Sequence, residues 1–388
     1  MPFGVQTMAE QRASLVEEIK SGDRSISEFC REYGVSRRTA YKWLERSELG
    51  ESMEDRSRVP LNSPNKTSPA VESVVLRARL QHPCWGGRKL KAYLERKGEA
   101  GIPTANAITA ILRRNGLISK EASLAATPFK RFERSAPNDL WQTDFKGHFA
   151  MENGSRCHPL TVTDDNSRFS LCISAKDGER FPGVRDSFLS LFRERGLPKA
   201  VLCDNGPPWG TSGVFGYTRF EVFLMDCGVL PIHGRPWHPQ TQGKGERFHR
   251  TLKSELLKRV SIKDLPHAQR ESDAFRTEYN EERPHHSLGN AVPADRYRNS
   301  DDLMPEAVKR WEYPEGCKVR RVRNHGYASF NGRDFFVSEA FGGMDVALVE
   351  AKEDGFMNII YRNFKIATID MRDWTFISKK ISKLKENV

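Results

Sequence analysis

The strongest constraint on the fold is a change of periodicity near residue 137. Before this point apolar residues recur at helical spacing, whereas beyond it short strand-like runs alternate with helical segments. The strand-like runs are DLWQTDFKGHF, CHPLTVTDDNS, FSLCISAK, KAVLCDNG and VLPIHGR, and the helical segments include FPGVRDSFLSLFRERGLP and GKGERFHRTLKSELLKR. Three strands followed by alternating helices and strands predict a mixed five-stranded sheet with helices on both faces. We therefore expect an α/β domain over residues 137–300.

Three acidic residues occupy distant positions in this predicted domain. Asp144 lies on the first strand, Asp204 ends the fourth, and Glu246 begins a helix. Acids that converge at one sheet edge repel one another unless a cation is present, and Mg²⁺ prefers carboxylate oxygens. Two such ions, about 3.5–4 Å apart, clamp the attacking and leaving oxygens of a phosphodiester. Taken singly, each acid has a plainer explanation as a solvated surface group.

The helix that begins near Glu246 adds cations to the third acid. Residues three, four and seven positions apart share a helical face. One stripe therefore carries Glu246, His249, Arg250 and Lys253, with Lys244 two residues before the acid. We predict DNA contacts for the basic members and for His249. The alternative is a solvated face with charge pairs between neighbouring turns.

The first third of the chain has the pattern of a helix-turn-helix. In SISEFCREYGVSRRTAYKWLER, Ser25 and Glu28 match a capping box, Gly34 permits a sharp turn, and Ser36 can cap the next helix. Cations at the start of that second helix suit insertion into the major groove of DNA. The predicted contacts are Arg37, Arg38 and Lys42. An ordinary helical hairpin with solvated charges is the alternative.

A second helical unit follows a polar linker. Ser68 and Pro69 open a helix, and WGGRKLKAYLERKG and TANAITAILRRNGLI continue the helical pattern, with Thr104 as a cap and Gly116 as a stop. Beyond it, TPFKRFERSAPND has no helical periodicity and suits a linker that follows phosphates. The predicted DNA contacts are Arg88, Lys89, Arg113 and Arg114 in the second unit, and Lys130 and Arg131 in the linker.

The positive charge is concentrated where these units lie. Of the formal net charge of +11, an excess of 8 falls in residues 1–135, which hold 24 Lys and Arg against 16 Asp and Glu. A polyanionic partner is the simplest explanation, although a basic surface alone is common. The sequence has neither an apolar run long enough for a bilayer nor a signal pattern. We expect a cytoplasmic protein without membrane contact, associated with the nucleoid when it acts.

Several motifs of the middle region resemble the DDE transposases of bacterial insertion sequences, within the retroviral-integrase-like superfamily. The resemblance rests on WQTDFKG, TVTDDNSRF, LCDNGPPW, RPWHPQTQGKGERFHRTLKSEL and YNEERPHHSLG, and covers residues 137–298. It implies an RNase H-like integrase core in which Asp144, Asp204 and Glu246 bind two Mg²⁺ or Mn²⁺ ions. It also implies that Lys253 touches DNA near the scissile end. The segment between Asp204 and Glu246 is longer than in many relatives.

The resemblance implies a DNA transposase. Such an enzyme binds the terminal inverted repeats of a mobile element, cleaves phosphodiesters with metal-activated water, and joins the freed 3′-OH ends to target DNA. Because two ends must be joined to one double-stranded target, we expect a homodimer or a higher oligomer on DNA. Two alternatives stay open at this point. One is a catalytically silent DNA-binding regulator derived from a transposase, and the other is a nuclease without strand transfer.

Other polar residues of the middle region have competing explanations. Asp164 and Asp165 precede a turn, and we predict that they are structural. Arg283 and His285 follow the predicted core strands, and for them DNA contact and a structural role are equally compatible with the sequence.

The last third has short strands at close spacing, with a hairpin signal at Asn331-Gly332. This pattern predicts a small SH3-like β-barrel whose strands include KVRRVR, YASF, RDFFV, MDVALVE, FMNIIY and KIATI. The chain is then a multidomain protein with α-helical units, an α/β core and a β-barrel. The expected boundaries are 1–49 and 67–118 for the helix-turn-helix domains, 50–66 and 119–136 for linkers, 137–300 for the core, 315–375 for the barrel and 376–388 for a basic tail.

Overall fold

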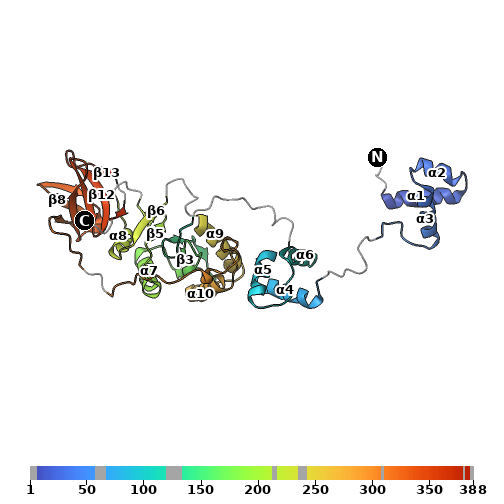
Figure 1. Cartoon of the computed structure of the whole chain (residues 1–388), viewed down its shortest axis with the longest axis horizontal. Coiled ribbons are helices and arrows are strands. Elements are labelled where there is room, and N and C mark those ends of the chain that lie inside the picture. Colours follow the sequence, from blue (N-terminus) through green and yellow to red (C-terminus); the bar gives the residue numbers. More distant parts are fainter. Residues whose placement is uncertain are drawn as a thin grey trace. The chain divides into compact units, whose positions relative to one another are not determined.

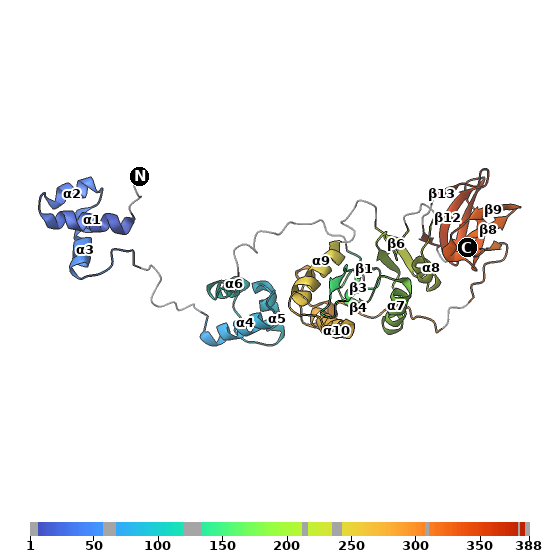
Figure 2. The same cartoon turned by 180° about the vertical axis from the view of Figure 1, so that it is seen from behind.

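The computed structural model describes residues 7–56, 67–118, 133–211, 216–234, 243–306, 310–378 and 381–384. The chain divides into two compact units, Met1–Lys66 and Thr67–Val388, and Figures 1 and 2 label many of their helices and strands. The predicted DNA contacts Lys130 and Arg131 lie outside the described residues. No helix in the described ranges combines the length and the apolar character that crossing a membrane requires.

The first unit is a bundle of three helices, α1 (Met8–Ser21), α2 (Ile26–Glu32) and α3 (Arg37–Glu48). The expected capping box is present, because the backbone N–H of Ser25 donates to Glu28 at 2.8 Å, and Ser36 caps α3. Gly34 makes the turn with a φ of 62°. Helix α1 was not predicted from the sequence, and it contributes buried residues to the core of the bundle. Its buried residues include Leu15, Val16, Phe29, Ala40 and Trp43.

The second unit begins with another three-helix domain, α4 (Pro69–Gln81), α5 (Gly87–Arg96) and α6 (Ala105–Arg114). The predicted caps Ser68 and Thr104 are both present, as each side chain accepts a backbone N–H of its helix. Helices α5 and α6 approach closely at Gly87, where a Cβ atom would lie 2.4 Å from the carbonyl oxygen of Ala105. Trp85, buried in the turn before α5, anchors the small core.

The central sheet has the predicted mixed topology. Its strands are β1 (Trp141–Phe145), β3 (Arg156–Asp164), β4 (Ser170–Lys176), β5 (Ala200–Cys203) and β6 (Leu230–His233). The order is β4-β3-β1-β5-β6, and β2 (Phe149–Ala150) adds a two-residue pairing to the start of β3. Strands β1, β3 and β4 are antiparallel, whereas β1, β5 and β6 are parallel. The five predicted strands are therefore all present.

Helices cover both faces of this sheet. Helices α7 (Phe181–Arg195) and α8 (Arg219–Asp226) share a core with Trp141, Phe145 and Leu160. On the other face, α9 (Gly243–Leu252) and α10 (Leu265–Glu281) pack against Ile173. Helix α9 continues into a π-helical turn, η3 (Lys253–Leu257), and short 3-10 turns η4 (His286–Leu288) and η5 (Pro293–Asp295) follow α10. Helices α7 and α9 were predicted from the sequence, whereas α8, α10 and the π-helical turn were not.

The C-terminal region is an all-antiparallel β domain. One sheet has the order β13-β12-β11-β10-β7 with β14 beside β12, and β8 and β9 form a separate hairpin. The bounds are β7 (Lys318–Arg321), β8 (Tyr327–Phe330), β9 (Arg333–Phe336), β10 (Asp345–Glu350), β11 (Phe356–Tyr361), β12 (Phe364–Asp370), β13 (Phe376–Ser378) and β14 (Ser382–Lys383), with a 3-10 turn η6 (Glu339–Phe341). The sheet and the hairpin share one hydrophobic core.

The segment predicted as a basic tail, 376–388, begins instead with two strands. Ser378 pairs with Thr368, and Lys383 pairs with Phe364, so both strands lie beside β12. The edge of β12 offers unpaired backbone groups that a following segment can satisfy. The prediction of a tail, which was based on the positive charge of the segment, is therefore wrong for residues 376–378 and 382–383.

Helix α8 joins the core to the C-terminal domain. Val222 and Met225 on α8, and Tyr217 just before it, belong to the hydrophobic core of the C-terminal domain. At the end of α8, Asp226 accepts hydrogen bonds from Tyr361 at 2.6 Å and from Arg362 at 2.8 Å. The long segment between Asp204 and Glu246 thus contains the surface on which the C-terminal domain sits.

The C-terminal domain offers a matched test of its packing. Gly326 and Gly332 both have a left-handed φ, of 88° and 76°, but a Cβ atom at 326 would lie 2.6 Å from the backbone nitrogen of Glu339, whereas at 332 it meets nothing. Gly332→Ala should cost about 1–2 kcal/mol from the backbone conformation. Gly326→Ala should cost roughly 1–3 kcal/mol more because the backbone must move. Calorimetric unfolding measures both, and equal losses would contradict the packing.

Candidate active site

The three acids lie on β1, just beyond the end of β5, and on α9. Side chains alternate along a strand. Trp141 and Phe145 of β1 point into the core that contains α7 and α8, so Asp144 points to the opposite face, toward α9. There its carboxyl oxygen lies 3.8 Å from Nδ1 of His249, and the side chain is 37% exposed.

The register of the parallel strands brings Asp204 to Asp144. Gln142 pairs with Leu202 across β1 and β5, and the pairing of the two strands ends there; the same register continued by two residues would set Asp204 opposite Asp144. Neighbours in a parallel register lie on the same face of a sheet. Asp204 is exposed just beyond the end of β5, and Nδ1 of His233 donates to its backbone oxygen at 3.0 Å.

The third acid completes an electrostatic cluster. Glu246 lies in the first turn of α9 and is exposed. Burial raises the pKa of Asp144, the negative charges of Asp204, Glu179 and Glu246 raise it further, and the backbone N–H of Phe145 lowers it, so that it reaches about 7. The structure thus places Asp204 and Glu246 within electrostatic range of Asp144. Within the described ranges, however, no three His, Cys, Asp or Glu side chains are close enough to hold a metal ion.

His249 lies against the acid rather than on an open surface. The Thr161 hydroxyl donates to the backbone oxygen of Asp144 at 3.0 Å, so Nε2 of His249 must donate to that hydroxyl at 2.8 Å. The Nδ1 lone pair then faces the Asp144 carboxyl. Burial, and then the charge of Lys146, lower the pKa of His249 to about 4. A neutral His249 bonded to Thr161 anchors α9 to β3 beside Asp144, a role different from the DNA contact that the sequence predicted.

Thr161 is a residue of the site that the sequence analysis missed. It is the direct antiparallel partner of Asp144 in β3. Only the pairing of β3 with β1 identifies Thr161 as a neighbour of Asp144. That pairing cannot be derived from the spacing of residues along the chain.

Asp164 and Asp165 have the predicted structural role. The carboxylate of Asp164 accepts the backbone N–H groups of Asn138 and Ser167, each at 2.8 Å. Asp165 is fully buried and accepts from Lys244 at 2.6 Å. Lys244, which we predicted as a DNA contact, therefore ties the first turn of α9 to the end of β3.

The remaining predicted DNA contacts fall into two groups. Those exposed on their helices or just beyond them are Arg37, Arg38, Lys42, Arg88, Arg113, Arg250 and Lys253. Two others have acidic neighbours, since Arg114 forms an ion pair with Glu72 and Nζ of Lys89 lies 3.9 Å from Glu255. Burial, and then the charge of Arg283, lower the pKa of Lys89 to about 8.

Arg283 and His285 are interior residues. Arg283 is 7% exposed and donates to both carboxylate oxygens of Glu255, at 2.8 and 3.0 Å. Burial, and then the charge of Arg283, hold the pKa of His285 well below its usual value. The structure therefore favours the structural alternative for both residues.

Comparison with known families agrees with this architecture. Two models described as an integrase core domain match residues 134–239 and 227–293. A model of the IS481 family transposase C-terminal domain matches residues 317–376. The chain carries an integrase core and a transposase C-terminal domain. The N-terminal helices match a helix-turn-helix domain at residues 11–60 and a homeodomain-like domain at residues 39–112.

Relatives of the integrase core occur in insertion elements. The chain is 29% identical over 245 residues to the insertion element IS407 uncharacterized 31.7 kDa protein of Burkholderia multivorans, covering 58% of this chain and 82% of the relative. It is 32% identical over 165 residues to the insertion element IS476 uncharacterized 39.2 kDa protein of Xanthomonas euvesicatoria. This match covers 42% of this chain and 46% of the relative, so it spans less than half of the relative's length. A solved simian T-cell lymphotropic virus intasome aligns with 16% identity and a TM-score of 0.36, over 80% of this chain and 99% of that chain.

The pH dependence of stability should report the Asp144 carboxyl when divalent ions are absent. Its folded pKa of about 7 lies above the ordinary value of 3.8. The folded state therefore binds more protons, and the free energy of unfolding falls as pH rises from about 4 to about 7. The free energy of unfolding of Asp144→Asn, measured in urea and taken relative to that of the wild type, should therefore be higher at pH 8 than at pH 4. Asp177→Asn, in an exposed turn, controls for net charge, and parallel pH profiles for Asp144→Asn and wild type would contradict the raised pKa.

Proposed function

We propose that the chain is a DDE transposase that cleaves phosphodiesters at the ends of a mobile element and joins the 3′-OH ends to target DNA. The observation that carries the proposal is that Asp204, just beyond the parallel strand β5, and Glu246 on α9 both lie near enough to Asp144 on β1 for their charges to raise its pKa. Carboxylates arranged in this way repel one another, and a bound cation would relieve the repulsion.

The donor set fits Mg²⁺ or Mn²⁺. Carboxylate oxygens are the ligands that these hard ions prefer, and Asp144, Asp204 and Glu246 would hold them. Two bound ions would supply an activated water and charge stabilisation at the phosphodiester. A solved HTLV-2 integrase catalytic core is described in complex with magnesium, and we extend that metal class to this chain as part of the proposal.

The residues around the acids give the site its shape. The hydrogen bonds from Thr161 to Asp144 and from His249 to Thr161 fix α9 against β1. Arg250 and Lys253 are exposed on the helix that carries Glu246, where their charges suit the phosphates of a bound DNA end. Positive charges such as those of Arg250 and Lys253, held near the scissile phosphate, would stabilise an anionic transition state.

The helical domains suit recognition of the element ends. Arg37, Arg38 and Lys42 are exposed in the first half of α3, the part of a recognition helix that contacts base edges. Joining two ends to one target requires two acid sites, so we propose a homodimer or higher oligomer on DNA. Light scattering of the DNA-bound protein gives the number of chains, and a single chain that joins paired ends would contradict it.

Removing any one acid should abolish chemistry but not DNA binding. Asp144→Asn, Asp204→Asn and Glu246→Gln each remove a charged ligand, and we expect cleavage and joining to fall by at least about 10³-fold. Labelled element ends incubated with plasmid and Mg²⁺ or Mn²⁺ measure both steps, while gel shifts measure binding.

Glu179→Gln is the matched control for these variants. Its carboxylate also raises the pKa of Asp144, but it accepts a hydrogen bond from His158 at 2.9 Å and is outside the proposed triad. It should retain activity. Cleavage without joining by the wild type would identify a nuclease, and near-normal activity of a triad variant would remove that residue from the site.

Arg37 and Arg38 should control which DNA is bound. If they reach base edges, replacing either with Ala should cost roughly 1–3 kcal/mol and relax discrimination between element ends and random duplex. If they contact phosphates, all sequences should weaken alike and the salt slope should fall by about one. Lys20→Ala is the control, because Lys20 bonds Ser47 near the opposite end of α3. Unchanged binding in both Arg variants would exclude α3 as the reading helix.

A further inference from the structure

A buried carboxylate lies near the far end of the helix that carries Glu246. Glu255 is in the π-helical turn η3, which follows α9 without a break. Its side chain is 7% exposed, because the same helical face packs Phe248 and Leu252 against α10. A buried charge is stable only when it is paired and hydrogen-bonded. The partners of Glu255 therefore decide how this end of the helix is held.

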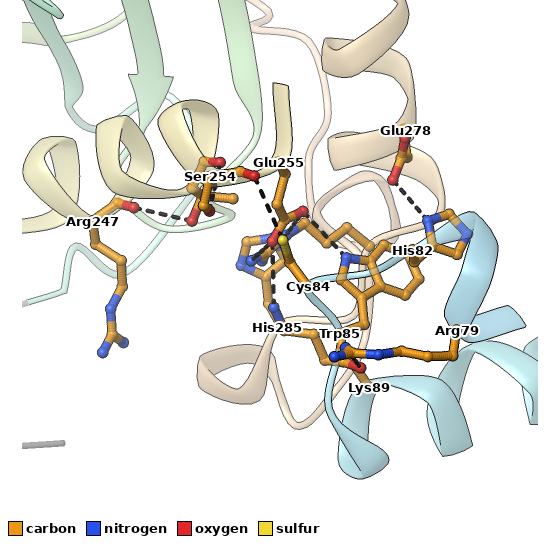
Figure 3. A network of polar contacts seen from close by, with 12 residues as sticks. Arg79, His82, Cys84, Trp85, Lys89, Arg247, Ser254, Glu255, Glu278 and His285 are labelled. Atoms are coloured by element: carbon orange, nitrogen blue, oxygen red, sulfur yellow. Dashed lines mark hydrogen bonds and ion pairs between the residues drawn. The ribbon is translucent and has the colours of Figure 1, made fainter. Parts of the chain in front are cut away.

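Those partners come from two different domains. Within the core, Arg283 donates to both oxygens of Glu255. From the α4–α6 domain, the indole N–H of Trp85 donates to one oxygen at 3.2 Å, and Nζ of Lys89 lies 3.9 Å from the other. Figure 3 shows Trp85 and Lys89 facing Glu255, with Ser254 next to it on the same turn.

The contact between the α4–α6 domain and the core extends beyond Glu255 to α10 and to another residue of η3. His82 bonds Glu278 of α10 at 2.9 Å (Figure 3), and its ring stacks on Trp85 at 3.7 Å. The thiol of Cys84 lies 3.5 Å from the backbone oxygen of Ser254. The turn between α4 and α5 thus touches η3 and α10 at once.

We infer that Glu255 is a positioning residue for Glu246, and that docking of the α4–α6 domain through Trp85 holds α9 in the position that the acid site needs. Glu255 lies nine positions after Glu246, about 13 Å along a helix. Because α9 runs into η3 without a break, a loosened Glu255 lets the whole helix shift. The inference rests on the proposed function for its catalytic consequence, but not for its effect on α9.

The arrangement gives the docked domain a second task beside DNA contact. Lys89, which we predicted as a DNA contact, points instead to a core carboxylate, whereas Arg88 and Arg113 stay exposed. The α4–α6 domain can then contact DNA through exposed residues while its α4–α5 turn stays on the core. DNA held by this domain would meet an acid site whose third member the same domain has fixed.

The test compares hydrogen exchange and chemistry in the full-length chain. Trp85→Phe removes one hydrogen bond to Glu255, and Glu255→Gln removes its charge. We expect amide exchange in residues 243–257 to rise about tenfold in both variants, as the loss of a buried hydrogen bond predicts, and joining of pre-cut ends to slow in parallel. Exchange in β1 should stay at the wild-type rate.

Asp295→Asn is the matched control. Asp295 pairs with Arg96 at 2.8 Å across the same interface but does not touch Glu255, so exchange in 243–257 should stay at the wild-type rate. Wild-type exchange in a folded Trp85→Phe variant, or a rise that is equal in β1, would overturn the inference. If the wild type shows no metal-dependent cleavage, the proposed function fails, while the exchange data still decide whether docking orders α9. Trp85→Phe keeps the test valid if Glu255→Gln does not fold.

Discussion

The repulsion between Asp144 and Asp204 is the constraint around which the core is arranged. Strand β1 pairs in parallel with β5, which leads into Asp204, and the charge of Asp204 raises the pKa of Asp144, a repulsion that costs free energy without a cation. The surrounding structure tolerates it because the remainder of both strands is tightly held. Trp141, Val201 and Cys203 are fully buried on the opposite face, so neither strand can slide to separate the acids.

Helix α9 carries the third acid and depends on contacts at both ends. In its first turn Lys244 bonds the buried Asp165, and further along His249 bonds Thr161. Beyond its last turn, Glu255 is held by Arg283 and Trp85. The contacts near the start come from the sheet itself, whereas the far end is shared with the α4–α6 domain. The geometry of the acid site is therefore a property of two domains and not of the core alone.

The core and the C-terminal domain are also joined by shared contacts, through α8. Helix α8 contributes Val222 and Met225 to the C-terminal core, and Asp226 receives hydrogen bonds from Tyr361 and Arg362. These residues lie in the segment between the second and third acids. This segment has a structural use, because it provides the surface for another domain.

The sequence by itself determined the local elements and the chemical types of the site. Caps such as Ser36, Ser68 and Thr104, the turn at Gly34 and the five core strands follow from short-range rules, because capping and alternation involve residues only a few positions apart. The family motifs pointed to three acids, but they did not show which residues support them. Thr161, the neutral state of His249, the strands in the predicted tail and the Trp85–Glu255 bond were decided by tertiary structure. Each depends on pairing or burial between segments far apart in the chain, and such contacts leave no periodic pattern in the sequence.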